Sequence, residues 1–497
     1  RNTELKMFVR FSDDGFTTSV VEELSVNRGD KLFLGAIPGS FNTAGKTVEY
    51  YFFTTTVNAS TITHANADLV SIDILNNGGA NYKYTVNHTT TEVDGPWNNG
   101  FTWTSGSVPP ADEPTEIKHT LSVSVDLDIS GDIIINPTVA LIITPGKSLK
   151  FSGNTIKADG LLGMFSSSTL YPSLILDPAS TITGTGNVEY KRHVNGIDSG
   201  NDLVSPPLAG ITFQGLTIIN SSTLASADLG SDNTAYAFAY FDVANGGTGN
   251  GSNGYVNLVS PLDNLTVLTP GRGYRAATTS TGGDLAFKSS KTIYNETFDP
   301  NPNLGVLNSD VTIPIFNNGE TNYKSWNLIG NPFSAYIKPI VTYIDNTALL
   351  PDGFKAFYLY KTSAGASTNY PGATFTSNGN WIILDQQWLL ANQSYALAPG
   401  QGFFVKAANP TGNFLFREAN RTIATGLPNT DDAIQGKSAT STSTISLSNT
   451  NYARTKLQLT QGSSLNEIDI YFTDTATKGL DSGDVSGFGG SASGIFS

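Results

Sequence analysis

The sequence contains no cysteine, two methionines and only four histidines among its 497 residues. The absence of cysteine excludes disulfide bonds, thiol catalysis and cysteine-ligated metals. The histidines, His64, His88, His119 and His193, show neither His-x-His nor HExxH spacing, and no GxSxG motif is present. We therefore predict surface histidines, no catalytic residues and no cofactor-binding residues, and we expect the protein not to be an enzyme.

Charged residues are also scarce, at 14% of the chain, and no apolar run reaches the length of a membrane span. The net charge is −14, and the 28 basic residues are scattered along the chain. Nucleic-acid affinity depends on Lys and Arg that neutralise phosphates, so nucleic acid is a poor candidate partner, and we expect no membrane insertion. Gly, Ser, Thr and Asn are plentiful instead, which is typical of extracellular β-proteins.

Apolar residues at 39% and aromatic residues at 10% are sufficient for buried cores. Helical periodicity is almost absent, so the predicted fold class is all-β, with tandem β-sandwich modules and a short β-solenoid segment. Residues 1–92 alternate with period two between Gly-, Asn- and Asp-rich turns, which predicts an immunoglobulin-like β-sandwich. The run "VEYYFFTT" at residues 48–55 is expected to be its central strand.

Residues 93–190 show a shorter rhythm. Apolar clusters recur about every seven to ten residues in this segment, for example in "IIINP", "LIITP" and "LKFSG". Such spacing favours stacked turns of a β-solenoid, each burying its apolar side chains on its neighbours. The alternative is a further sandwich with short strands.

Residues 191–420 contain an internal duplication. "NDLVSPPL", "AFAYFD", "PGRGY" and "GDLAFK" recur in order as "WNLIGNPF", "FYLYKT", "PGQGF" and "GNFLFR". We interpret residues 191–300 and 301–420 as two jelly-roll-like β-sandwich modules, called copy 1 and copy 2 below. This alignment makes Tyr274 and Phe403 counterparts in two cores.

The repeated Pro-Gly-x-Gly-aromatic phrase has two interpretations. A phosphate loop would open onto a helix, whereas both phrases lead into a strand pattern. Pro followed by Gly suits a type II turn, because Gly accepts positive φ, and the second Gly permits close backbone packing. We therefore predict a duplicated structural turn.

Residues 421–445 are Ser- and Thr-rich and are expected to be a linker. Residues 446–497 contain two convincing strand patterns, which we interpret as the truncated start of a further β-module. The chain starts at Arg1 without a signal-peptide pattern, so we expect it to be a processed or excised piece.

Three turns carry clustered carboxylates. "FSDDG" and "DLDISGD" are expected to cap backbone amides, and "DSGDVSG" is the leading candidate for a Ca²⁺ site, with Asp481 and Asp484 as ligands. Two tryptophans lie in loop-like or inserted sequence, and we consider Trp97 and Trp388 as platforms for carbohydrate binding. Trp326 and Trp381 occupy matched positions of the duplication and are expected to be core residues.

Several phrases resemble secreted cell-surface proteins of Bacteroidota that are exported by the type IX secretion system. They include "TWTSGSVP", "LIITPGKSLKFSGN", "WNLIGNPF", "APGQGFFVKA" and "IYFTDTATKGLDSGD". The resemblance implies an extracellular location, contact with the type IX machinery during export, and modules found in adhesins and as appendages of hydrolases. Thr475 in "DTA" is similar to the O-glycosylation motif of that group.

Two functions follow as expectations. The first is a non-enzymatic adhesin or extracellular structural or filament segment, whose partners are extracellular glycans, protein surfaces or further copies of itself. The alternative is an accessory carbohydrate-binding region of a larger secreted hydrolase.

Overall fold

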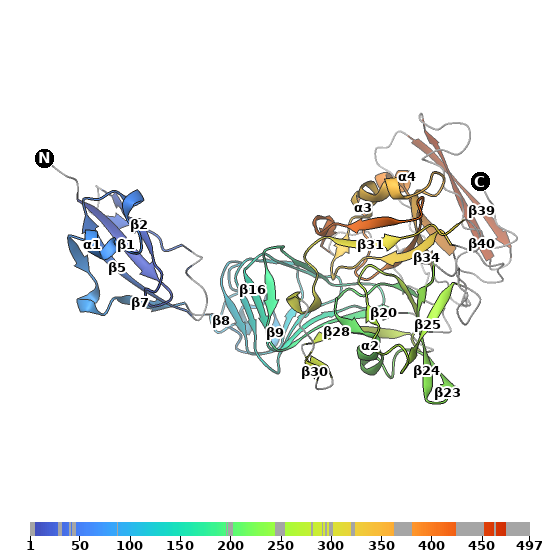
Figure 1. Ribbon diagram of the computed structural model, residues 1–497, viewed down its shortest axis with the longest axis horizontal. Helices are drawn as coiled ribbons and strands as arrows, with labels where there is room; N and C mark the ends of the chain where they lie inside the picture. The colour runs from blue at the N-terminus through green and yellow to red at the C-terminus, as the bar shows by residue number, and fades with distance from the viewer. Residues whose placement is uncertain are drawn as a thin grey trace.

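The computed structural model describes residues 5–27, 32–38, 41, 46–86, 88–194, 196, 202–243, 254–279, 282–290, 292–293, 296–297, 302–319, 324–361, 380–423, 452–461 and 464–473. These residues are mostly β-strand and include a β-solenoid of about four turns (Figure 1). The described helices are few and short: α1 (Ala67–Val70), α2 (Phe213–Ile219), α3 (Pro339–Asn346) and α4 (Gln386–Ala391).

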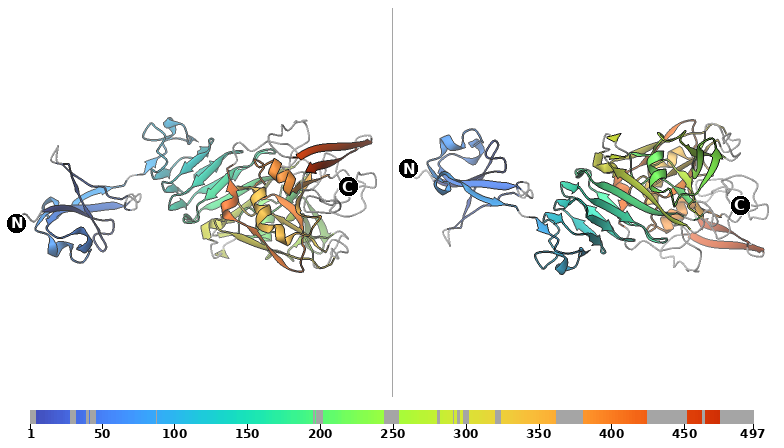
Figure 2. Two further views of the ribbon diagram at one scale, coloured as in Figure 1. Left: turned by 90° about the horizontal axis from the view of Figure 1, so that it is seen from above. Right: turned by 90° about the horizontal axis from the view of Figure 1, so that it is seen from below.

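An antiparallel sheet forms the N-terminal part, which lies at one end of the molecule (Figures 1 and 2). Its central strand is β5 (Thr47–Thr55), which pairs with β1 (Lys6–Ser12), β6 (Asp73–Leu75) and β7 (Tyr82–Thr85). The predicted central strand is therefore confirmed. The outer strand β2 (Val20–Glu23) pairs with β1, and β3 (Ser25–Asn27) forms a separate ribbon with β4 (Leu32–Leu34).

The solenoid consists of three sheets of parallel strands, and each of its three middle turns contributes one strand to each sheet, whereas the first and last turns contribute strands to two of them. The first sheet contains β8 (Thr89–Thr90), β10 (Thr115–Ile117), β13 (Ile133–Ile135), β16 (Thr155–Ala158) and β19 (Thr181–Thr183). The second contains β9 (Gly95–Pro96), β11 (Leu121–Val123), β14 (Ala140–Ile143), β17 (Leu161–Phe165) and β20 (Asn187–Val194). The third contains β12 (Leu127–Ile129), β15 (Ser148–Phe151) and β18 (Ser173–Leu176).

The short apolar clusters stack in register along the solenoid. Leu121, Leu141, Leu162 and Val188 occupy one column, and all four are fully buried. Because the side chains of a strand alternate between its two faces, each three- or four-residue strand contributes one or two apolar residues to the core. The predicted β-solenoid is confirmed, and the short-stranded sandwich alternative is wrong for residues 93–190.

Both ends of the solenoid are covered. At the N-terminal end, the ring of Trp97 packs edge-on against Trp103, with ring centroids 5.0 Å apart. At the other end, β20 pairs antiparallel with β28 (Gly283–Ser290), the Ile182 amide donates to the Asn303 side chain, and the Leu174 amide donates to the Ser334 carbonyl. Covered ends matter because an open sheet edge is a template for pairing with another chain.

Copy 1 and copy 2 repeat one strand order. In copy 1, β27 (Tyr274–Ala276) lies between β21 (Asp202–Val204) and β24 (Asn233–Phe241), and β24 also pairs with β25 (Tyr255–Ser260) and β23 (Ser226–Gly230). In copy 2, β36 (Gly402–Lys406) lies between β32 (Trp326–Gly330) and β34 (Ala356–Lys361), and β34 pairs with β35 (Asn380–Asp385). The pair β20 and β28 of copy 1 corresponds to β31 (Val311–Ile315) and β37 (Gly412–Phe416) of copy 2.

Each Pro-Gly turn lies against a strand of the other copy. The Ser205 amide donates to the Gly400 carbonyl over 2.8 Å, and the Gly330 amide donates to the Gly271 carbonyl over 3.0 Å. These two bonds are counterparts, because Ser205 matches Gly330 and Gly271 matches Gly400 in the two copies. The predicted structural turn therefore also forms a reciprocal contact between the copies.

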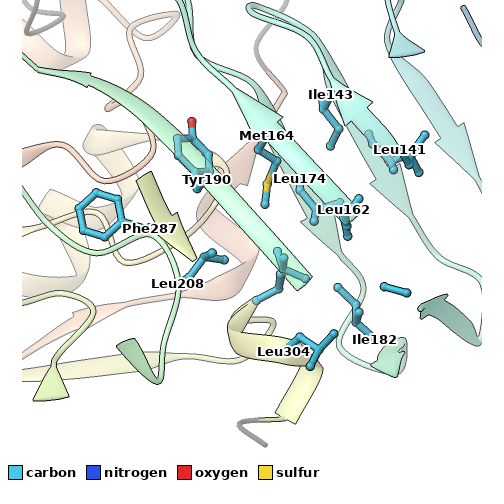
Figure 3. Close-up of a cluster of buried hydrophobic side chains, with 14 of the residues drawn as sticks. Leu141, Ile143, Leu162, Met164, Leu174, Ile182, Tyr190, Leu208, Phe287 and Leu304 are labelled. Atoms are coloured by element: carbon cyan, nitrogen blue, oxygen red, sulfur yellow. The ribbon is translucent and has the colours of Figure 1, made fainter. Parts of the chain in front are cut away.

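Three hydrophobic clusters hold these parts together. One runs without a break from Trp97 through the solenoid into copy 1, as far as Tyr274 and Phe287. Figure 3 shows the part of it that includes Leu141, Tyr190 and Phe287. A second is the core of copy 2 and includes Phe403. The third lies between the copies, where the Phe241 and Phe404 rings meet edge-on at 5.0 Å.

The remaining strands are short ribbons. They are β22 (Ile211–Thr212) with β26 (Val267–Leu268), β29 (Thr292–Ile293) with β30 (Glu296–Thr297), β33 (Tyr336–Ile337) with β38 (Arg421–Thr422), and β39 (Tyr452–Gln461) with β40 (Ser464–Thr473). Residues 421–422, expected at the start of a linker, thus belong to a strand of copy 2. The two strands expected after residue 446 form a hairpin.

Candidate functional site

A surface groove of about 420 Å³ lies on copy 1, beside the strand pair β20 and β28 and the end of helix α2. Its walls come from three parts of the chain: Glu189 and Lys191 on β20, Ile219 to Thr223 at and after the end of α2, and Thr279 with Gly282 to Asp284 before and within β28. Both strands belong to the six-stranded sheet that closes the solenoid, so the groove sits on a well-paired part of the molecule.

The floor of the groove is made by Ala286 and Asn220, which are 6% and 2% exposed. The Asn220 side chain accepts a hydrogen bond from the Ala286 amide and donates to the Leu216 and Ala286 carbonyls, each over 2.8 Å. These bonds tie the end of α2 to β28. The floor is therefore held by hydrogen bonds between the Asn220 side chain and backbone atoms. The groove is deep at this point because Ala286 has a small side chain.

The charged groups of the groove alternate in sign. Lys191 Nζ lies 3.7 Å from Glu189 Oε1 and 4.4 Å from the centre of the Phe165 ring. At the far end, His193 Nδ1 lies 3.5 Å from Asp284 Oδ1. The Glu189 side chain is only 12% exposed, so its carboxylate faces the groove more than bulk solvent. The groove thus offers hydrogen-bond acceptors and donors side by side.

A second polar cluster lies on the N-terminal sheet. Ser19 Oγ lies 2.8 Å from His64 Nδ1, and Arg10 Nε donates to the same Ser19 oxygen over 2.8 Å. The Asp68 carboxylate accepts hydrogen bonds from Arg10 and from the Tyr51 hydroxyl. The Asp68 carboxylate therefore orients the Arg10 guanidinium and not the His64 imidazole, so the cluster lacks the geometry of a catalytic triad. Its hydrogen bonds connect α1 to β1.

The other three histidines lie apart from one another. His119 contacts Thr91, His193 contacts Asp284, and His88 is partly buried, which lowers its pKa by desolvation. The prediction that all four are surface residues is too simple, since only His64 is exposed. Within the ranges that the structure describes, no group of three or more metal-ligating side chains occurs.

Asp14, Asp126 and Asp132 of the early turns cap backbone amides, as expected, whereas Asp13 and Asp128 form ion pairs with Lys46 and Lys150. Asp132 accepts from the amides of Asn154 and Thr155 on the next solenoid turn. Asp14 accepts from the backbone and hydroxyl of Thr18 and from the Ser12 hydroxyl, and these bonds, the Thr18 amide first, lower its pKa to about 2. Asp481, Asp484 and Thr475, our predicted Ca²⁺ ligands and glycosylation site, lie outside the described residues.

The two predicted sugar platforms differ. Trp97 is 1% exposed and closes the solenoid core, where the Trp103 indole donates to its carbonyl over 2.8 Å. A sugar cannot stack on a ring covered in this way, so the prediction for Trp97 is wrong. Trp388, on α4, is partly buried and its ring meets Tyr395 edge-on at 5.0 Å. Its predicted role stays a prediction.

The groove itself was not predicted. None of Glu189, Lys191 and Asp284 forms a motif, and they come together only because β28 returns to pair with β20. The one signal in the sequence is the duplication, since "GDLAFK" has Ala286 where "GNFLFR" has Leu415.

Together, the described residues define a mostly β protein in which a parallel solenoid continues into the first of two modules with one strand order. Residues 88–495 match a family described as "Domain of unknown function (DUF8693)", and the chain belongs to that family. The match begins where the solenoid begins and leaves the N-terminal sheet outside it. No curated protein and no solved structure matches the chain. In the part of the chain that is described, no helix has the length and apolar character needed to cross a membrane.

Proposed function

We propose that this protein is a non-enzymatic, secreted cell-surface protein that serves as an adhesin or an extracellular structural segment. Export by the type IX secretion system belongs to the proposal and is supported by the phrases quoted above. The observation that carries the mechanical part is the hydrophobic cluster that runs unbroken from the solenoid into copy 1. Because this core is continuous, it resists separation of the solenoid from copy 1.

The reciprocal turns support the same role. Copy 2 contacts copy 1 through both Pro-Gly turns, and it contacts the solenoid through Ser334 and through Arg421, whose guanidinium donates to the Leu176 carbonyl over 2.9 Å. Residues 88–423 then act as one rigid unit that holds its surface away from the cell. The covered solenoid ends favour a discrete segment over a filament grown by stacking solenoids end to end.

We also propose the finer architecture: an immunoglobulin-like sandwich in residues 1–92 and jelly-roll-like sandwiches in residues 191–300 and 301–420. The antiparallel sheet around β5 supports the first. The equal strand order of the copies and the cluster between their sheets support the second and third. Residues 446–497 would begin a further module.

Single-molecule pulling on the full chain tests the mechanical role. Residues 88–423 are expected to unfold in one event, because their cores and hydrogen-bond ladders are shared. Separate unfolding steps for the solenoid and for each copy would overturn it. Antibody labelling of intact cells in electron micrographs, with protease shaving as the control, tests the cell-surface location.

The alternative, an accessory carbohydrate-binding region of a larger hydrolase, is favoured by one observation, the polar groove on copy 1. Its partners would be extracellular glycans. Turnover of a polysaccharide by this chain alone would contradict both functions.

A further inference from the structure

The duplication supplies a comparison for the groove, because copy 2 builds the same strand pair and helix end with different side chains. Asn346 at the end of α3 holds the Leu415 amide and carbonyl, as Asn220 at the end of α2 holds those of Ala286. Leu415 is therefore the counterpart of Ala286, and its pairing partner Thr312 is the counterpart of Lys191.

Copy 2 carries a larger side chain on this face. Leu415 stands where copy 1 has Ala286. Arg417 then closes the face from above, because its guanidinium lies 3.6 Å from Asp310 and 3.1 Å from Asp345. This ion pair crosses from the strand to the helix end over the position where a groove would otherwise lie.

Copy 1 lacks two of these elements. Ala286 stands for Leu415, and Ile219 stands for Asp345, so the ion pair from the strand to the helix end has no counterpart. Lys288 and Glu189 stand for Arg417 and Asp310. Lys191, which has no charged counterpart in copy 2, instead projects along the wall next to Glu189. The groove in copy 1 therefore results from several side-chain differences between the copies, which share one backbone arrangement.

We propose that this groove binds a short neutral saccharide. Sugar hydroxyls donate and accept hydrogen bonds at once, and the groove presents acceptors at Glu189 and Asp284 beside a donor at Lys191. The hydroxyls of Ser222, Thr223 and Thr279 line the same space. A volume of about 420 Å³ falls in the range of small-ligand sites.

Other ligand classes fit the groove less well. Glu189 and Asp284 lie on either side of the single lysine, so a phosphate or another polyanion would meet two like charges. A divalent cation would require several converging oxygen ligands, and the described residues contain no such group. A peptide side chain of large apolar area would find only Ile219 and Ala286 as apolar walls.

The proposal rests on the proposed adhesive role and gives it a binding site. It is tested by applying the full chain to an array of neutral, amino and acidic saccharides, followed by titration calorimetry with the best neutral hit. Ala286→Leu introduces the residue that copy 2 carries on the same backbone, so it fills the groove without a foreign geometry. Lys191→Met removes the donor and keeps the length of the side chain.

Both variants are expected to weaken binding at least about tenfold, since each removes either the space or a charged hydrogen bond. Thr312→Ala, at the matched position of copy 2, is expected to leave binding unchanged. Equal thermal midpoints for Lys191→Met and the native chain would show that its loss of affinity is local.

Three results would overturn the proposed saccharide site: binding of acidic saccharides, binding of no saccharide, or saccharide binding that both groove variants leave intact. Surface labelling and pulling experiments report on the adhesive role separately. If the array shows no binding and surface labelling is normal, the saccharide site is rejected and the proposed adhesive or structural function is not.

Discussion

Asn220 and Asn346 occupy the same position in the two copies and make the same set of hydrogen bonds. Each follows or ends a helix, each donates to the carbonyl four residues earlier in that helix, and each pairs with both the amide and the carbonyl of one strand residue. An asparagine side chain accepts through its oxygen and donates through its NH2 group, so it can pair with both the amide and the carbonyl of one strand residue. These two residues fasten helix to strand in both copies.

Asn220→Ala and Asn346→Ala are each expected to destabilise the protein by about 2–4 kcal/mol, because a buried amide and carbonyl lose their partners. Urea unfolding followed by tryptophan fluorescence measures the loss. The exposed Asn413 provides the control, since Asn413→Ala should change stability by less than about 0.5 kcal/mol. Equal losses in all three variants would contradict the fastening role.

The second glycine of each Pro-Gly turn is required by the contact between the copies. A Cβ on Gly402 would lie 2.7 Å from the Leu203 carbonyl carbon, and one on Gly273 would lie 2.5 Å from Leu328 Cγ. Gly402→Ala and Gly273→Ala are expected to cost about 1–3 kcal/mol through overpacking. Gly106→Ala, which meets no atom within 4 Å but has positive φ, separates the steric cost from the backbone cost. The prediction fails if Gly106→Ala is the most damaging of the three.

Arg192 breaks the equivalence of the copies at a buried position. Its counterpart is Ile313, and each lies under the Pro-Gly turn of the other copy. Arg192 Nη1 donates to the Pro399 carbonyl over 2.6 Å, and the guanidinium stacks on Tyr171, but Nε and Nη2 are buried without a hydrogen-bond partner.

Because unpaired buried polar groups are costly, Arg192→Ile is expected to lie within about 1 kcal/mol of the native stability. Arg192→Ala should lose about 2–4 kcal/mol, because it also leaves a cavity. Denaturant midpoints of the two variants decide the point. Equal losses would show that the guanidinium itself, rather than the volume it fills, stabilises the junction.

Trp97 closes the solenoid, so its removal should act on stability and not on sugar binding. Trp97→Ala is expected to cost about 3–5 kcal/mol and to speed hydrogen exchange first in β8–β11. Trp388→Ala, on the partly buried face of α4, is the comparison and should leave exchange in those strands unchanged. Loss of glycan binding in Trp97→Ala with normal exchange would contradict this assignment.

Alkaline pH should unfold the molecule through its buried tyrosines. Burial raises the pKa of Tyr171 and of Tyr360 to about 12, whereas an unfolded phenol titrates near 10. The neutral phenols therefore contribute their full stability below about pH 10, and this contribution is lost as the pH rises towards about 12.

Urea midpoints between pH 8 and 12 measure the effect. Each buried phenol adds up to about 1.4 kcal/mol per pH unit to the slope in that window. Tyr171→Phe removes one titrating group and should flatten the curve. A flat profile in the native chain would sink the prediction.

The regular parts of the fold were accessible from the sequence because they repeat. The solenoid follows from apolar clusters such as Ile133–Ile135, spaced too closely for long strands, and the Pro-Gly turns follow from glycine chemistry. The contact between those turns was not accessible, because a local pattern does not say which distant strand will lie against it.

The candidate site shows the same division. The loop composition around Trp97 suggested exposure, but loop residues at a solenoid end lie on the open core and cover it. Glu189 and Asp284 meet only through the pairing of β20 with β28, which depends on the whole of copy 1 between them. The small size of Ala286 becomes informative only by comparison with Leu415, and the backbone is needed to show that the two residues are counterparts.

The reciprocal turns bear on how this chain can change over generations. If either copy were lost, the Pro-Gly turn of the remaining copy would lose the strand that it contacts. The remaining half of the shared cluster, with Phe241 or Phe404, would be exposed. We therefore expect the two copies to be retained together, because each completes the cluster of the other, whereas side chains on their outer faces, such as Ala286 and Leu415, can differ.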